Sequence, residues 1–121
     1  MKILVPAVAL SLAFLAPVAA ADSTPVGPLP KGPVASVVTT RSALVAVALP
    51  RQSAASGLVW RLARRVDPAV LVQVSEADVG SSVVVVFRAR GRGNVRIAFA
   101  LTRGDTRAKA LRAIVTDVSV R

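Results

Sequence analysis

The fold class is decided by residues 83–101, VVVVFRARGRGNVRIAFAL. Every second residue in each half of this stretch is large and apolar, which is the period of a β-strand that buries one face. The turn-forming residues 91–94, GRGN, separate the two halves, so we predict a β-hairpin. Arg88, Arg90 and Arg96 are then expected to share the opposite face. Two strands with one apolar face each need a second sheet to cover them, and this requirement predicts a sandwich.

The rest of the folded part also consists of short strand-like runs between turn signals. The end of the chain has two interpretations, because residues 106–115 have a helical composition while the β-branched alternation over 114–120 favours a closing strand. We predict six or seven strands with Trp60 on a middle one, which is typical of an all-β, immunoglobulin-like antiparallel β-sandwich. The other predicted strands cover 35–40, 43–49, 58–63 and 69–75, and the predicted loops cover 50–57, 76–81 and 102–108.

The N-terminal part of the chain has the pattern of a secretory signal peptide. Lys2 supplies a positive charge, residues 3–15 form an apolar run, and small residues follow up to position 21. The apolar run is shorter than the roughly 20 residues that a membrane-spanning helix needs. We therefore assign residues 1–21 to a signal peptide and expect a secreted or periplasmic protein. Residues 22–33 are rich in Pro and Gly and predict an extended linker, which leaves residues 34–121 as one domain.

The composition argues for a binding protein and against an enzyme. The chain contains no His and no Cys, which excludes an imidazole base, a thiolate nucleophile, a disulfide and a His/Cys zinc site. Its six Asp and Glu residues are scattered without paired-acid spacing. We predict no catalytic residue, no metal, no cofactor and a monomeric state.

The chain is strongly basic, with a formal net charge of +10 that comes almost entirely from arginine. A basic exported protein meets acidic partners, so one alternative function is an envelope sandwich that binds an acidic polymer, a membrane surface or a protein through an arginine-rich face. Nucleic acid is not expected as a partner, because the chain is exported and has few aromatic side chains on which bases could stack. The arginines could equally serve only to keep an aliphatic domain in solution.

Residues 44–60 resemble the chagasin family of cysteine-peptidase inhibitors. In that family a strand ending Leu-Pro is followed by the loop Asn-Pro-Thr-Thr-Gly and by a strand that begins aromatic-x-Trp. Here Leu49-Pro50 ends a predicted strand, Gly57 closes a loop of small residues, and Leu58-Val59-Trp60 follows.

The resemblance extends to most of the chain. Residues 87–91 and 95–103 also fit the spacing of the family, so the resemblance covers about residues 34–121. It implies an immunoglobulin-like sandwich with three loops that enter the substrate cleft of a papain-like cysteine peptidase. The middle loop of this reversible wedge would pass over the catalytic thiol. Rigid loops suit such a role because they lose little conformational entropy on docking.

The loop motifs of the family are only partly present. Gly57 matches the glycine that closes the first loop, Gly80 is the one glycine kept from a Gly-x-Gly-Gly motif, and Arg103 is kept from Arg-Pro-Trp. Other positions carry smaller or different side chains, which removes two prolines and a tryptophan that would fix or anchor the loops. The peptidase-binding residues that the resemblance implies are Ser53, Ala54, Ala55, Ser56, Gly57, Gly80, Ser81, Arg103, Gly104 and Asp105.

Overall fold

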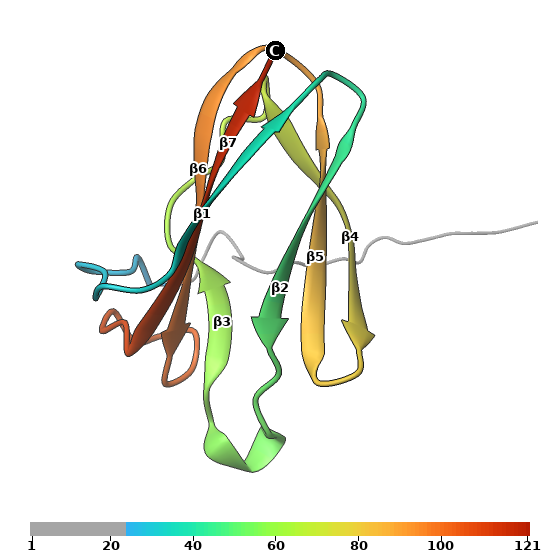
Figure 1. Ribbon diagram of the computed structural model, residues 1–121. Helices are drawn as coiled ribbons and strands as arrows, with labels where there is room; N and C mark the ends of the chain where they lie inside the picture. Colours follow the sequence, from blue (N-terminus) through green and yellow to red (C-terminus); the bar gives the residue numbers. More distant parts are fainter. Residues whose placement is uncertain (1–23) are drawn as a thin grey trace, which may run out of the picture.

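The computed structural model describes residues 24–121, which form two β-sheets packed face to face (Figure 1). The first sheet has the strand order β1-β7-β6-β3 and the second has the order β2-β5-β4. The predicted signal peptide, residues 1–21, lies outside the described residues. The strands are β1 (Val34–Thr39), β2 (Leu44–Pro50), β3 (Val59–Leu62), β4 (Leu71–Val79), β5 (Ser82–Ala89), β6 (Gly93–Thr102) and β7 (Arg112–Val120), and the 3-10 turn η1 covers Ala54–Ser56.

The predicted all-β sandwich is confirmed, and so is the strand at the end of the chain. Neighbouring strands pair in antiparallel fashion except β1 and β7, which pair in parallel with Val34 opposite Val115. The helical interpretation of residues 106–115 is wrong, because residues 106–111 form no helix and β7 pairs with β6 from Arg112 onward. The inward-facing positions in this strand carry residues such as Ile114, Val118 and Val120, whose branched side chains pack well on a sheet.

The predicted hairpin over residues 83–101 is wrong. The two halves form β5 and β6 and face the core as predicted, with Phe87 and Phe99 at most 1% exposed. However, β5 pairs with β2 and β4, whereas β6 pairs with β7 and β3. The connection crosses from one sheet to the other, and at Gly91 a Cβ would lie only 2.4 Å from the carbonyl oxygen of Ala69. Alternation shows which side of a strand faces the core, but the same pattern fits strands that meet across it.

The arginines therefore do not share one face. Arg88 lies on the outer face of the second sheet, between Leu44 and Val72 in the register. Arg96 lies on the outer face of the first sheet, where it forms an ion pair of 2.7 Å with Asp117. The two arginines are thus on opposite sides of the molecule, and the predicted arginine face is wrong.

The loop predicted over residues 76–81 is mostly strand. β4 continues to Val79, and the turn is confined to Gly80-Ser81. The register between β4 and β5 shifts between Gln73 and Ser75, so that a bulge places the exposed Val74 outside the ladder. This extra residue interrupts the alternation of the strand.

Residues 24–33 have no regular secondary structure but lie against the outer face of the first sheet, beside the β6–β7 connection (blue in Figure 1). The amide of Gly27 donates to the carbonyl of Ala108 at 2.8 Å. A Cβ on Gly32 would lie 2.1 Å from the carbonyl oxygen of Ala113, so glycine is required for this close approach. Under this segment Ala98 and Ala100 are fully buried although they point away from the core.

Candidate functional site: the loop end of the sandwich

Three connections lie together at one end of the sandwich, at the bottom of Figure 1. The register fixes this arrangement, because Pro50 at the end of β2 lies opposite Ser82, which in turn lies opposite Val79. On the other sheet Val59 lies opposite Thr102 at the end of β6. We call this end the loop end; it consists of the first loop (51–58), the second loop (80–81) and the third loop (103–111). All ten residues that the resemblance assigned to peptidase binding lie here.

The first loop contains a compact turn held by its own backbone. Ser53 is extended, with φ −70° and ψ 148°, and η1 follows directly. The carbonyl of Ser53 accepts two hydrogen bonds from Ser56, one from the amide at 3.1 Å and one from the hydroxyl at 2.7 Å. The Ser56 hydroxyl oxygen also accepts from the amide of Leu58 at 3.1 Å. Small, exposed side chains around a turn of this kind allow another backbone to come close.

Each of the three loops contains a glycine in the left-handed region. The φ angles are +70° at Gly57, +59° at Gly80 and +83° at Gly104. A Cβ at any of these glycines would meet no atom within 4 Å, so space does not restrict a side chain there. The backbone conformation does restrict it, because L-residues pay about 1–2 kcal/mol to adopt this region. Proline, which fixes φ near −65°, cannot replace Gly104 in this conformation.

Arg51 holds the first and second loops together. Its backbone amide donates to the carbonyl of Ser81 at 2.9 Å. Its guanidinium donates to the carbonyl of Gly80 at 2.9 Å and to the carboxylate of Asp78 at 3.3 Å. Because these bonds span the two loops, the positions of the loops are coupled to each other.

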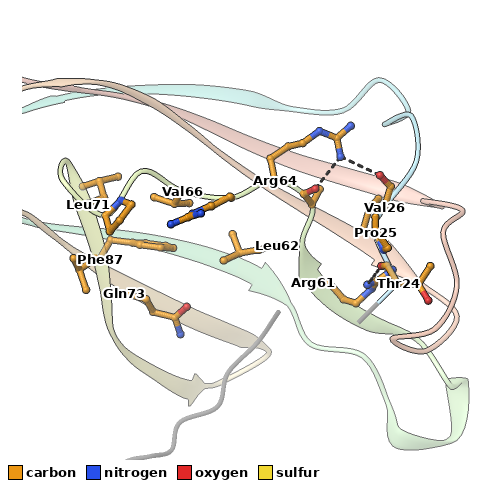
Figure 2. A pocket seen from close by; sticks show the side chains of 14 residues that line it. Thr24, Pro25, Val26, Arg61, Leu62, Arg64, Val66, Leu71, Gln73 and Phe87 are labelled. Atoms are coloured by element: carbon orange, nitrogen blue, oxygen red, sulfur yellow. Dashed lines mark hydrogen bonds between the residues drawn. The ribbon is translucent and has the colours of Figure 1, made fainter. Parts of the chain in front are cut away.

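The buried side chain of Arg61, on β3, anchors the third loop through hydrogen bonds. Arg61 is 4% exposed, and its Nε donates to the hydroxyl of Thr102 at 3.1 Å. One guanidinium nitrogen donates to the carbonyl of Thr24 at 2.6 Å, and the other donates to the carbonyl of Arg107 in the third loop. The Thr102 hydroxyl in turn donates to the carbonyl of Gly104 at 2.7 Å. Figure 2 shows Arg61 reaching Thr24, with Arg64 bonded to Val26 nearby.

Trp60 lies at the loop end, where it is half-buried and packs against the edge of the core. Its indole N–H donates to the carbonyl of Pro50 at 2.8 Å, which ties the start of β3 to the end of β2. The guanidinium of Arg112 lies 5.7 Å from the centroid of the ring, within the range of a cation–π contact. Trp60 therefore acts as a brace across the base of the first loop.

Two hollows lie near these elements. A cavity of about 250 Å³ opens between the sheets behind the first loop and includes Leu58, Trp60 and Glu76 in its lining. A larger open groove of about 720 Å³ separates the edges of β3 and β4, with Leu71 and Phe87 at its base (Figure 2). Among residues 24–121 no group of three potential metal ligands is found, and no helix is long and apolar enough to cross a membrane.

The fold and the loop end together define a class of protein: a β-sandwich that presents three fixed loops at one end. Among solved structures it is similar to the crystal structure of the cysteine protease inhibitor EhICP2 from Entamoeba histolytica, with a TM-score of 0.54 and 16% sequence identity. The match covers 74% of this chain and 100% of that one. No family model matches the sequence, and no curated protein matches it. At this identity the similarity shows a shared fold.

Sequence reasoning missed the residues that hold the loops in place. Arg51 and Arg61 were counted as parts of a general positive charge, and residues 24–33 were assigned to a linker. A weak signal existed for Arg61, because it alternates with Trp60 and Leu62 in a short β-run. Alternation does not reveal that residues far away in the chain would bury the opposite face.

Proposed function

We propose that this chain inhibits papain-like cysteine peptidases reversibly, by inserting the loop end into the active-site cleft. The single observation that carries the proposal is that three separately encoded loops lie at one end of a fold shared with a cysteine protease inhibitor. The partial loop motifs at Gly57, Gly80 and Arg103 support the same conclusion. In this proposal the protein is a binding partner of the peptidase and does not itself catalyse a reaction.

The first loop is the part of this surface best suited to lie over a catalytic thiol. Its tip consists of Ser53 to Gly57, all exposed and small. Because Ser56 holds the turn closed through two bonds to the carbonyl of Ser53, the loop does not present an extended peptide for cleavage. A preformed loop also loses little conformational entropy on binding. These properties favour inhibition without turnover.

A titration of the protein against papain tests the proposal directly. We expect residual peptidase activity to fall with inhibitor concentration and to return on dilution, with the inhibitor intact by mass spectrometry. Gly57→Val should abolish inhibition, because a β-branched side chain at φ +70° changes the turn and adds bulk at the tip. Ser42→Val is the matched control, since Ser42 also has a positive φ of 76° but lies in the β1–β2 turn, away from the loop end. It should leave inhibition unchanged.

A gain-of-function variant makes the test sharper. Ala54→Pro fits the observed backbone, because Ser53 already has the extended conformation that precedes proline and Ala54 is the first residue of η1. Combined with Ser53→Asn and Asp105→Trp, it restores three side chains of the family motifs and should tighten inhibition. If this folded triple variant is still inert against several papain-like peptidases, the inhibitor proposal fails.

We further propose that the protein acts outside the cytoplasm, on the support of the signal-peptide pattern in residues 1–21. N-terminal sequencing of the protein recovered from its native host should find a chain that begins near residue 21 or 22. A chain that begins at Met1 and remains in the cytoplasm would contradict this localisation.

A further inference from the structure

The outer face of the β2-β5-β4 sheet is unusually apolar. Residues opposite each other in an antiparallel pair share one face, so the register gives four rows of three side chains across this sheet. Nine of the twelve positions are Ala, Val, Leu or Pro, and the three polar ones are two serines and Arg88. We call this surface the apolar face; its rows are Leu44–Arg88–Val72, Ala46–Val86–Ser75, Ala48–Val84–Ala77 and Pro50–Ser82–Val79.

Most of the apolar face is exposed in the part of the chain that the structure describes, although Val72, Val84 and Val86 are only partly exposed. Leu44 and Val79, at two of its corners, are each 58% exposed, and the alanines of β2 are exposed as well. An antiparallel sheet with one face in water normally alternates apolar and polar residues. The outer face of the first sheet does not expose a comparable apolar surface. Residues 24–33 bury its apolar part, and the ion pair between Arg96 and Asp117 occupies another part. A contiguous apolar patch without such a cover indicates an interaction surface.

The distribution of large and small side chains on the apolar face would allow the same face of a second copy to pack against it. Val84 and Val86 form a ridge along the central strand, and smaller residues at Ala46, Ala48 and Ala77 form shallow furrows on both sides. Strands are about 4.8 Å apart, so ridge and furrow are separated by one strand spacing. In a second copy packed face to face, the side chains of the two faces interdigitate along the strands, as they do between packed sheets.

We propose that the chain forms a two-fold symmetric dimer in which the apolar faces of two copies pack on each other. A two-fold arrangement uses the same patch on both subunits, and here it turns the strands of one copy antiparallel to those of the other. Arg41, Arg88 and Arg90, which lie at the end of the face opposite the loop end, then lie over the loop end of the partner. They are separated from their counterparts by about the length of a strand, roughly 20 Å, which exceeds the screening length of about 8 Å at physiological salt.

The size and chemistry of the face favour a second copy over other occupants. A footprint of about 20 Å by 14 Å buries on the order of 1,000 Å² in total, at the lower limit for a specific interface. We therefore expect a reversible dimer that forms with rising concentration. A bilayer surface is a poorer match, because the face carries Ala and Val and lacks the Trp and Tyr side chains that anchor proteins at membrane interfaces.

Sedimentation velocity of the full chain, from micromolar to near-millimolar concentration, tests the proposal. We expect the wild type to shift from monomer to dimer across this range. Ala48→Glu places a charge at an exposed position in one of the two middle rows of the face and should weaken the dimer at least tenfold while the circular dichroism spectrum is unchanged. Val38→Glu is the matched control: Val38 is 63% exposed on β1, outside the face, and the charge change is the same. It should dimerise like the wild type.

A crosslinking experiment checks the symmetry. Because the chain contains no cysteine, Ala48→Cys introduces a single thiol near the centre of the face, and oxidation should link two copies far faster than for Val38→Cys. A wild type that stays monomeric at all concentrations overturns the proposal. So does a dimer that Ala48→Glu leaves intact, because another part of the chain would then hold it. Neither outcome depends on peptidase inhibition.

Discussion

Arg61 provides the most direct test of how the third loop is held. Replacement by Met keeps the length and apolar stem of the side chain and removes the guanidinium. Three hydrogen bonds are lost, to the hydroxyl of Thr102 and to the carbonyls of Thr24 and Arg107. Hydrogen bonds from a charged donor contribute about 1.5–3 kcal/mol each, whereas several kcal/mol of desolvation cost disappears with the buried charge. We therefore expect Arg61→Met to lower the free energy of unfolding by about 3 kcal/mol.

This loss is large enough to measure in several ways. Urea unfolding followed by Trp60 fluorescence gives the free energy directly, and about 3 kcal/mol corresponds to a fall in Tm of about 12–24 °C for a domain of this size. Hydrogen exchange of the Gly27 amide should accelerate as well, because this amide bonds to Ala108 in the loop that Arg61 supports. These changes would locate the effect at the contact between residues 24–33 and the third loop.

A neighbouring arginine supplies the control. Arg64 is exposed and donates to the carbonyls of Val26 and Gly27 at 3.2 and 3.3 Å. Arg64→Met should cost less than about 1 kcal/mol, because exposed acceptors find water when the side chain is removed. If Arg61→Met is as mild as Arg64→Met, Arg61 does not anchor the loop and the reasoning is refuted.

Three further predictions concern the core, the brace and the surface. Phe99→Ala should cost about 3–5 kcal/mol by urea unfolding, because Phe99 is completely buried between the sheets; a smaller cost would mean that the sheets close over the cavity. Trp60→Phe should cost only about 1 kcal/mol by circular dichroism, since mainly the hydrogen bond to Pro50 is lost. The hydrogen bond from Arg96 holds the pKa of Asp117 below its usual range, so the stability it adds is present above the unfolded pKa and is lost as the pH falls through the folded pKa. In an NMR titration Arg96→Gln should raise the pKa of Asp117, and an unchanged pKa would contradict this origin.

The sequence by itself determined where most of the strands lie and which side of each faces the core, although it missed the second half of β4. Val85, Phe87, Ile97 and Phe99 were predicted inward, and all four are at most 1% exposed. Such predictions succeed because alternation is a local property: a strand must place successive side chains on opposite faces, whatever its partners are. The loop positions followed in the same way, from turn residues such as Gly57.

Only the tertiary structure decided which strands pair and what covers the outer faces. The alternation in β5 and β6 satisfies both a hairpin and a pair of strands in different sheets, so the sequence could not separate them. Arg61 is buried because Thr24 and Arg107, 37 and 46 positions away in the chain, supply its acceptors. The apolar outer face likewise arises from a register among three strands. Whether a residue is buried depends on which distant segments pack against it, and the local alternation of the sequence does not contain this information.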